Sequence, residues 1–347
     1  MKKLHYIFMA VAACTVVSLS SCNGNTPTAE TSSSPVAGVT NPATEAASQN
    51  GHSGHGGKQI NINDAILSEL DKLEGKLGIP ALSNKIQANR PYKSPEELVT
   101  KKIISQAQFD QIKDLVTIKE IVLEGEAKDV DYMTKLGLMK GHLLVAKELL
   151  DQNQPKQAEP HIGHPVEEIY VDVEEQLNER KVKEFKTTLV SLEDLVKSNP
   201  KSDKLNPDFK TSMQSVENAI AVLPEGQRNK PAFVLQIING LLDSANSEYT
   251  AAVAGGKISA PIEYQDSRGF VIYAQELYKG ISAQVAKDSP DADKTITTAM
   301  ADLVKNWPAA IPPAAAVKTP EEVTKLVKTI ELESQKLIDK GSTQAQK

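Results

Sequence analysis

The stretch Leu77-Gly78-Ile79-Pro80-Ala81-Leu82, followed by the break Asn89-Arg90-Pro91-Tyr92, decides the fold of the first part of the chain. Apolar residues flank both segments at helical spacing, so each segment is expected to join two short helices. The apolar positions on the first two helices are Ile66, Leu67, Leu70, Leu73, Leu82 and Ile86. Asn63 or Asp64 is expected to cap the first helix.

A second pair of helices is expected between residues 94 and 117. Ser94 should cap the third helix, with Pro95 at the first helical position and Glu97 completing a capping box. Ile103-Ile104-Ser105 is expected to connect it to a last helix. The apolar positions of that helix are Phe109, Ile112, Leu115 and Val116. Residues 58–117 are therefore predicted to form a small helical domain built from two hairpins.

Residues 60–117 resemble a double helix-hairpin-helix domain of the kind found in competence-type DNA receptors and in the extrinsic U subunit of photosystem II. The matching residues are Ile62-Asn63, Ala65, Leu70, Leu73, Gly78-Ile79-Pro80, Ile86, Arg90-Pro91-Tyr92, Ser94, Glu97-Leu98 and Ile112. In this family, backbone N–H groups of a glycine-rich hairpin bind a phosphate. The resemblance implies that the hairpins at Gly78-Ile79-Pro80 and Ile103-Ile104-Ser105 meet DNA or a partner protein.

Both hairpins depart from the Gly-apolar-Gly pattern of this family, because the first has one glycine and the second has none. β-branched residues resist the positive φ that such a hairpin can require. Residues 58–117 carry nine Lys or Arg and eight Asp or Glu, which is not the basic face that phosphate binding favours. We therefore expect this module to dock on a protein of the cell envelope, with DNA binding as the alternative.

The N-terminus has the pattern of a secretory signal peptide over residues 1–21, with Lys2 and Lys3 before an apolar run from Tyr6 to Leu19. The run ends in Leu19-Ser20-Ser21-Cys22, which resembles the lipobox of bacterial lipoproteins. The resemblance implies lipid on Cys22. In bacterial lipoproteins an aspartate after the cysteine usually retains the protein at the inner membrane, so Asn23 implies anchoring at the outer membrane, facing the periplasm. The alternative is an ordinary signal peptide in which Cys22 is incidental. Residues 22–57 are rich in small and polar residues and are expected to form a disordered tether.

The remaining chain, residues 118–340, is predicted to be a larger helical-bundle domain, with a disordered tail over 341–347. Helices are expected at 129–152, 165–179, 182–198, 208–222, 231–254, 261–286, 290–306 and 320–338. Only 4% of the 347 residues are aromatic, which also favours helix over a β-sandwich. The fold class is therefore all-α. The formal charge of −6 argues against non-specific nucleic-acid binding by the whole chain.

Three histidines fall within 23 residues of this domain, at His142, His161 and His164. Pro155 to Pro165 is expected to be a connection, with Pro165 beginning the next helix. An antiparallel hairpin would then bring His142 alongside the other two, with Glu168 as a nearby carboxylate. Imidazole and carboxylate together suit a transition metal such as iron, zinc or copper. The alternative is structural, with the histidines satisfying backbone groups at a helix junction.

The helix expected to begin at residue 261 carries a similar pattern of polar residues. Glu263 and Asp266 repeat the three-residue spacing of His161 and His164. A duplicated hairpin would place these two carboxylates opposite the two histidines. Alternatively, Arg268 would form a buried ion pair with Glu263 or Asp266.

The spacing His164-x-x-Glu167 is also similar to that in imelysin-like envelope proteins associated with iron uptake. That family has its glycine two residues before the histidine, whereas Gly163 is adjacent to it here.

No nucleophile elbow, phosphate loop or HExxH motif is present in the sequence. The sequence therefore predicts a lipid-anchored binding or scaffolding protein with a His/Glu metal site. The alternatives are a competence-type DNA receptor and a metal-dependent envelope enzyme or metal carrier.

Overall fold

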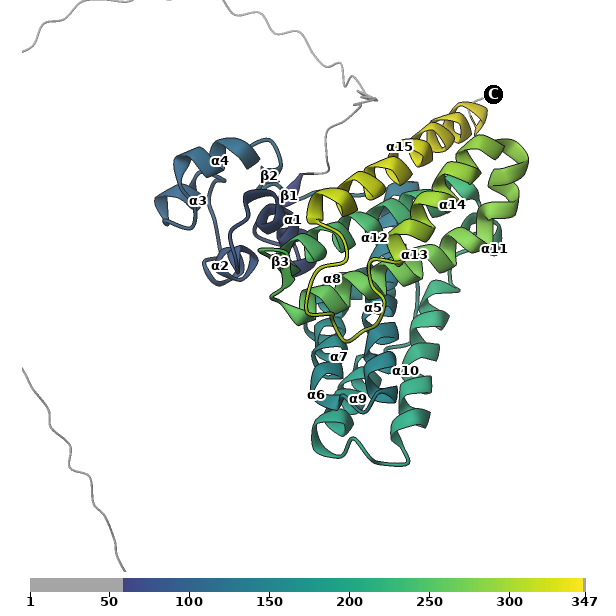
Figure 1. Cartoon of the computed structure of the whole chain (residues 1–347), viewed down its shortest axis with the longest axis horizontal. Helices are drawn as coiled ribbons and strands as arrows, with labels where there is room; N and C mark the ends of the chain where they lie inside the picture. Colours follow the sequence, from purple (N-terminus) through teal and green to yellow (C-terminus); the bar gives the residue numbers. More distant parts are fainter. Residues whose placement is uncertain (1–58, 346–347) are drawn as a thin grey trace, which may run out of the picture. The chain divides into compact units, whose positions relative to one another are not determined.

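A computed structural model describes residues 59–345, and helices make up nearly all of their regular structure (Figure 1). The predicted all-α class is confirmed. Within the described range, the strands are four segments of two residues each, which form two pairs. The predicted signal peptide, Cys22 and the expected tether over residues 22–57 lie outside the described residues.

The first module contains four short helices, α1 (Leu67–Leu77), α2 (Leu82–Ala88), α3 (Glu97–Thr100) and α4 (Gln106–Ile112). Strands β1 (Ile60–Asn61) and β2 (Val116–Thr117) pair in parallel and join the two ends of the module. The module has its own apolar core, which includes Ile62, Leu70, Leu73, Leu82, Ile86, Leu98 and Ile112. The expected two-hairpin arrangement is therefore present.

The first helix begins later than expected, because the side chain of Asn63 is hydrogen-bonded to the backbone of Tyr92 and does not cap a helix. The Asn63 side chain accepts from the backbone N–H of Tyr92 (2.7 Å) and donates to the carbonyl of Tyr92 (2.9 Å). Asn63 therefore ties the start of the module to the break at residues 89–92. Helix α1 starts at Leu67 with Ile66 as its N-cap residue, and neither Asn63 nor Asp64 caps it.

The capping box lies at a different helix from the one expected. Ser94 does not form a capping box with Glu97. The carboxylate of Glu97 instead accepts from the N–H of Lys93 (3.2 Å). The box forms at Ser105 and Gln108, where each side chain accepts from the backbone N–H of the other. The expected connection at Ile103-Ile104-Ser105 therefore ends as the cap of α4.

The larger domain is built from long helices whose positions agree with the hydrophobic periodicity. They are α5 (Gly125–Asp151), α8 (Tyr170–Glu179), α9 (Lys186–Ser198), α10 (Leu205–Ile220), α12 (Pro231–Ala252), α13 (Pro261–Asp288), α14 (Pro290–Val304) and α15 (Pro320–Ala345). A short helix, α11 (Glu225–Arg228), precedes α12, and strands β3 (Val253–Ala254) and β4 (Lys257–Ile258) form the hairpin before α13. Helix α15 continues to Ala345, past residue 340 where a disordered tail was expected.

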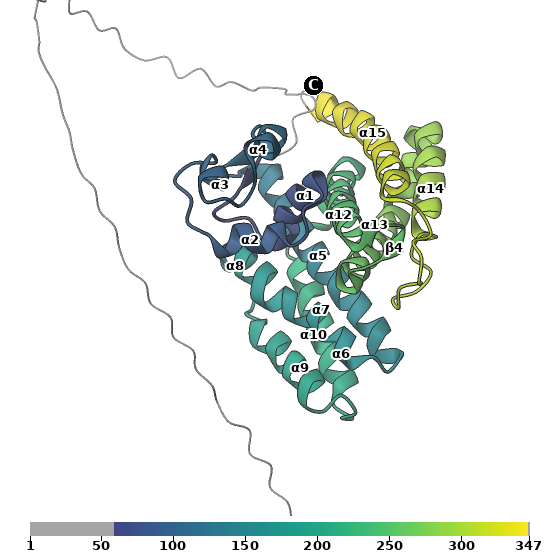
Figure 2. The same ribbon diagram turned by 60° about the vertical axis from the view of Figure 1, so that its left-hand side comes forward.

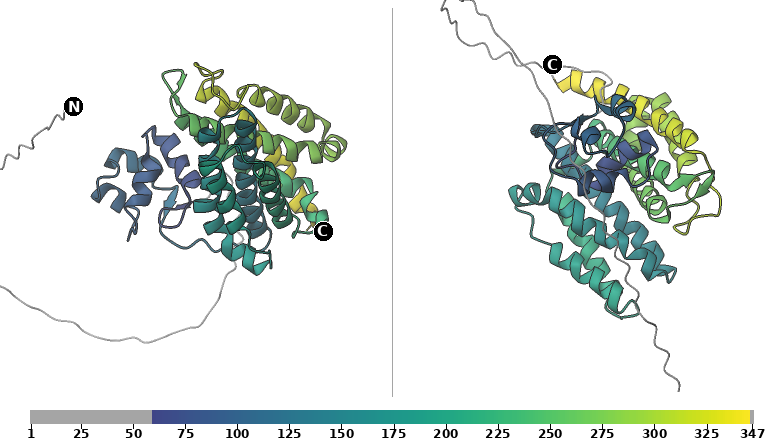
Figure 3. Two further views of the ribbon diagram at one scale, coloured as in Figure 1. Left: turned by 90° about the horizontal axis from the view of Figure 1, so that it is seen from below. Right: turned by 90° about the vertical axis from the view of Figure 1, so that its left-hand side faces the viewer.

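Helix α12 is central, because it packs against α13, α15, α5 and also against α1 of the first module (Figure 2). Figure 3 shows the two modules from two further sides. One large apolar core includes residues from α5 to α15 and also Ile66, which immediately precedes α1. The two modules are thus joined by a packed contact as well as by the chain itself.

The segment expected to be a connection between Pro155 and Pro165 is helical. It consists of α6 (Pro155–Ala158), α7 (Pro160–His164) and a π-helical turn, η1 (Pro165–Ile169), which continues into α8. A proline inside an α-helix removes a hydrogen bond and crowds the preceding turn. The wider π turn, a form often found at functional sites, begins at Pro165. His161 and His164 therefore lie within a helical run, and the expected helix start at Pro165 is wrong.

Helices α5 and α13 touch through their backbones at two glycines. A Cβ atom at Gly269 would lie 2.2 Å from the carbonyl oxygen of Gly141, and one at Gly141 would lie 2.7 Å from Cδ1 of Phe270. Any side chain larger than hydrogen would push the two helices apart. This close approach brings His142, the next residue on α5, next to the segment of α13 that carries Asp266.

We predict that Gly269→Ala destabilises the protein by about 1–3 kcal/mol, because the added methyl group overpacks the crossing. The matched control is Gly280→Ala on the same helix, where a Cβ meets no atom within 4 Å. That change should be neutral or stabilising by up to about 1 kcal/mol. Urea unfolding followed by circular dichroism measures both, and equal stabilities of the two variants would contradict the assigned crossing.

Candidate metal centre

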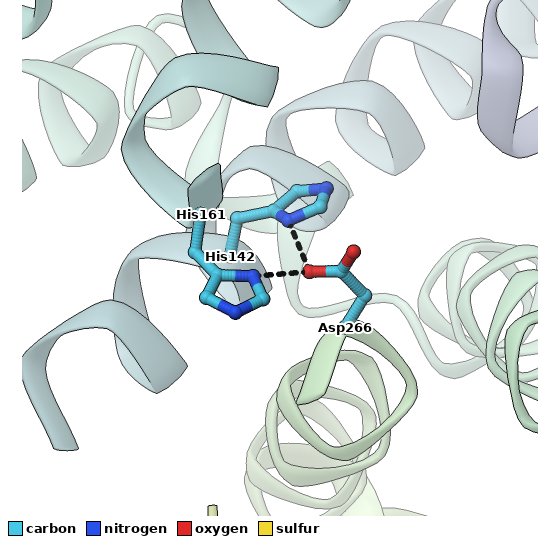
Figure 4. Close-up of side chains that lie close together, drawn as sticks. All are labelled: His142, His161 and Asp266. Atoms are coloured by element: carbon cyan, nitrogen blue, oxygen red, sulfur yellow. Dashed lines mark hydrogen bonds and ion pairs between the residues drawn. The ribbon is translucent and has the colours of Figure 1, made fainter. Parts of the chain in front are cut away.

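Three buried side chains from three helices meet in the larger domain (Figure 4). His142 comes from α5, His161 from α7 and Asp266 from α13. Nδ1 of His161 lies 2.6 Å from Oδ1 of Asp266, and Nδ1 of His142 lies 2.7 Å from the same oxygen. Each residue offers one ligand atom, and these atoms all lie within 4.8 Å of one another.

The hydrogen bonds of Gln265 determine which nitrogen of His161 carries a proton. Nε2 of Gln265 donates to the carbonyl of Ala310 (3.2 Å) and to Oε1 of Gln157 (2.9 Å). Because a carbonyl only accepts, this contact fixes the orientation of the Gln265 amide. Its Oε1 therefore faces Nε2 of His161 at 2.8 Å and accepts a hydrogen bond from the N–H there. In neutral His161, Nδ1 then presents a lone pair to Asp266.

This arrangement needs a positive charge between His161 and Asp266. A lone pair on Nδ1 facing a carboxylate oxygen at 2.6 Å is repulsive. The contact becomes favourable when His161 takes a second proton or when a metal cation binds both atoms. His142 presents a similar case, because its Nδ1 approaches the same oxygen but is buried without a hydrogen-bond partner. Two imidazole nitrogens thus converge on one carboxylate oxygen.

The second oxygen of Asp266 faces His164, whose Nδ1 lies 3.7 Å from Oδ2. Burial by itself would raise the pKa of Asp266, but the charges and hydrogen bonds of His142 and His161 hold it well below its usual range. Burial lowers the pKa of His142. Burial also opposes charge on His164, but the neighbouring carboxylates, Asp266 first, raise its pKa to about 9. Asp266 is therefore ionised at neutral pH and available as a ligand.

A cavity of about 230 Å³ opens beside His142, His164 and Asp266. Its walls come from both modules, since α1 and α2 contribute residues together with α12, α13 and η1. The carboxyl groups that line it are those of Asp71, Glu74, Glu168, Glu248, Glu263 and Asp266. Burial raises the pKa of Glu168 and of Glu263. The cavity is therefore a strongly acidic space that ends at the histidines.

The structure brings together most of the residues singled out in the sequence. His142, His161 and Asp266 form the cluster, and His164, Glu168 and Glu263 line the cavity next to it. Glu167 is exposed and does not line the cavity. In the wide π turn that follows His164, Glu168 faces the cavity in its place.

Arg268 pairs with neither of the carboxylates proposed for it. Its guanidinium contacts Glu148 of α5, with Nε 2.8 Å from Oε2. It also donates to the carbonyl of Trp307. Residues two apart on a helix point to different sides, so Arg268 cannot share the face of Asp266. Asp266 therefore has no compensating arginine.

Several site residues were not found from the sequence. Gln265 gave no signal, because its role depends on contacts with Gln157 and Ala310, far apart in the chain. Asp71, Glu74 and Glu248 belong to two different modules, and only the docking of α1 on α12 brings them to one cavity. No local spacing could reveal that arrangement.

The first hairpin uses its backbone N–H groups internally. The carboxylate of Glu74 accepts from the N–H of Ala81 (2.9 Å) and of Ser83 (3.2 Å) at the start of α2. Gly78, with φ of 61°, donates to the carbonyl of Glu74 at 2.8 Å. Ile79 and Pro80 lie between these contacts. Two backbone amides at the start of α2 are thus already bonded to a carboxylate of the same chain.

The second hairpin is satisfied in the same way. The N–H groups of Ile103 and Ile104 donate to the carbonyl of Leu98 (2.9 and 3.1 Å), and Ser105 donates to Gln108 (2.8 Å). The positive φ that the missing glycine would supply occurs at Lys102, with φ of 59°. In both hairpins, several of the amide groups that could face an anion are therefore bonded within the module.

Residues 56–117 match the helix-hairpin-helix motif, and residues 224–341 match the iron permease-associated 4-helix bundle domain. The helix-hairpin-helix match confirms the fold expected for the first module and is typical of macromolecular docking. The second match contains Gln265 and Asp266 but not the histidines, which precede it. Searches of the curated proteins and of solved structures found no match. The two matches join a docking motif to a domain associated with iron permeases.

Proposed function

We propose that this chain is a metal carrier of the cell envelope that binds iron through His142, His161 and Asp266. The observation that carries the proposal is that Nδ1 of His161 lies 2.6 Å from Oδ1 of Asp266 while its Nε2 faces the amide oxygen of Gln265. A buried group of this kind is costly when it is left unpaired. A metal cation would convert the two facing donors into ligands of one ion.

The spacing of the donor atoms fits such an ion. Nitrogen and oxygen ligands bind first-row metals at about 2.0–2.2 Å, so adjacent ligands lie about 3 Å apart. The two Nδ1 atoms lie 2.6 and 2.7 Å from Oδ1 of Asp266, close to that separation. Gln265 accepts from Nε2 of His161, which is the outer hydrogen bond that metal-ligating histidines usually make.

The donor set favours iron among the candidate metals. Two imidazoles and one carboxylate are the protein ligands of many non-haem Fe(II) sites. Further oxygen donors line the adjoining cavity at Glu168 and Glu263. The match of residues 224–341 to an iron permease-associated domain supports the same metal. Zinc and copper are the alternatives against which iron is tested.

We predict that the untagged full chain binds about one Fe²⁺ per molecule under anaerobic conditions, because three buried ligands converge on one point. His161→Ala should abolish this binding, since it removes the ligand held by Gln265. Elemental analysis after gel filtration measures the bound metal, with Zn²⁺ and Cu²⁺ in parallel samples. Glu167→Gln is the matched control, because Glu167 is exposed beside the site and should leave binding unchanged. Equal Fe²⁺ content in wild type and His161→Ala would refute the proposal.

We predict that Gln265→Leu weakens Fe²⁺ binding about 10–100-fold without changing the stoichiometry. The leucine removes the acceptor that fixes the proton on Nε2 of His161, so Nδ1 is no longer held as the ligand atom. Competition titration with a chelator of known affinity measures the change. An unchanged affinity would show that His161 does not bind through Nδ1.

We further propose that the protein is lipid-anchored through Cys22 at the outer membrane, facing the periplasm. The lipobox at residues 19–22 supports this, although it lies outside the described residues. Of the described helices, none is both long and apolar enough to cross a membrane. The tether would then give the folded part room to reach a protein partner in the envelope.

We propose that the helix-hairpin-helix module docks on a protein rather than on DNA, because Glu74 and the carbonyl of Leu98 already accept from several of its hairpin amides. We therefore expect no salt-dependent shift of duplex DNA by the full chain, even at low salt. An electrophoretic mobility assay between 20 and 200 mM salt (about the range over which phosphate contacts weaken) measures this. A competence-type receptor domain serves as the positive control. A clear shift at low salt that disappears at high salt would favour the DNA-receptor alternative.

A further inference from the structure

The helix-hairpin-helix module rests on the larger domain mainly through α1, which packs along α12. Nζ of Lys72 lies 2.7 Å from Oδ2 of Asp243 at the edge of this contact. Next to them, the backbone of Gly75 packs on Ser247. The contact therefore combines close packing with an ion pair.

Two carboxyl groups face each other inside the same contact. Asp71 of α1 and Glu248 of α12 are hydrogen-bonded to each other, and Glu248 is 4% exposed. Two carboxyl groups can share a hydrogen bond only when one of them is protonated. Burial accordingly raises the pKa of Asp71 to about 7 and that of Glu248 well above its usual range. Ser83 of α2 also donates to Asp71.

These two carboxyl groups line the cavity that ends at His142 and Asp266. One wall of the cavity therefore comes from the helix-hairpin-helix module, with Asp71 and Glu74, and the other comes from the larger domain. Across the two walls, Asp71 and Glu248 share a proton, whereas the carboxylates of Glu74 and Glu263 repel each other when no cation is present. A cation in the cavity would attract both walls at once.

We propose that the helix-hairpin-helix module serves as one wall of the iron site, with Asp71 as its contributing carboxylate, so that the bound cation and the docked module stabilise each other. This inference rests on the proposed iron site. By thermodynamic linkage, a cation that tightens docking is itself bound more tightly by the docked form. A fold that usually binds anions at its hairpins would thus present carboxylates to a cation bound between the two modules of this chain.

Hydrogen-exchange mass spectrometry of the full chain tests the coupling directly. Anaerobic Fe²⁺ should slow exchange in α1 and in the facing part of α12 on the order of tenfold. Exchange in α14, which packs mainly on α13 and α15, should change much less. Mg²⁺ at the same concentration distinguishes site binding from general screening, because it prefers oxygen ligands and retains its water.

Two variants of α1 separate the role of Asp71 from that of charge in general. Asp71→Asn keeps a hydrogen bond to Glu248 while removing one charge, so α1 should be protected without Fe²⁺ and gain little on adding it. Glu69→Gln removes a charge from the same helix, but Glu69 lines a different cavity. It should respond to Fe²⁺ as the wild type does.

Fe²⁺ binding is measured in the same samples, so that the two proposals can fail separately. If Fe²⁺ binds but α1 exchanges at an unchanged rate, the wall inference is wrong and the iron site stands. Equal protection by Mg²⁺, or protection spread evenly over all helices, would also overturn the inference. If no Fe²⁺ binds, both proposals fail.

Discussion

The contact between Gly141 of α5 and Gly269 of α13 is the constraint on which the rest of the site depends. At this crossing, a Cβ atom at Gly269 would lie 2.2 Å from the carbonyl oxygen of Gly141. Only two glycines allow helices to approach so closely. As a result, His142 packs edge-on against Phe270, with the ring centroids 5.0 Å apart. Its Nδ1 also lies 2.7 Å from Oδ1 of Asp266. Helix α7 then supplies His161 from the third side.

The polarity of this crossing is difficult to explain by stability alone. A buried carboxylate with two imidazoles costs desolvation energy, and apolar residues of similar size often replace such groups with no loss of stability. Here the carboxylate and the two imidazoles are buried together, and the side-chain amides of two glutamines orient the ring of His161. Gln157 and Gln265 together hold His161 in the form whose Nδ1 faces Asp266. This degree of orientation is what a ligand for a cation requires, since the donor atom must be fixed before the ion arrives.

Much of the fold follows from the sequence, because the long helices carry clear apolar faces and proline marks many of their first residues. The site was partly visible for a related reason. The spacing of three residues places His161 with His164, and Glu263 with Asp266, on one side of their helices. The π turn at Pro165 was not visible, and it determines that Glu168 rather than Glu167 faces the cavity. Asn63 was mistaken for a cap, because its partner Tyr92 is 29 residues away. Contacts at such separations depend on tertiary structure, which local spacing does not encode.

The role of Glu74 shows how a fold and its usual ligand can be separated. Backbone amides at the start of a helix favour any nearby negative group, whether it is a phosphate or a carboxylate of the same chain. In this module Glu74 occupies the amides of Ala81 and Ser83, so a phosphate would have to displace it. The same carboxylate lines the acidic cavity. The α2 amides therefore hold the negative charge of Glu74 at the edge of the acidic cavity. Retaining the helix-hairpin-helix fold is consistent with this use, because the hairpin is what holds Glu74 in position.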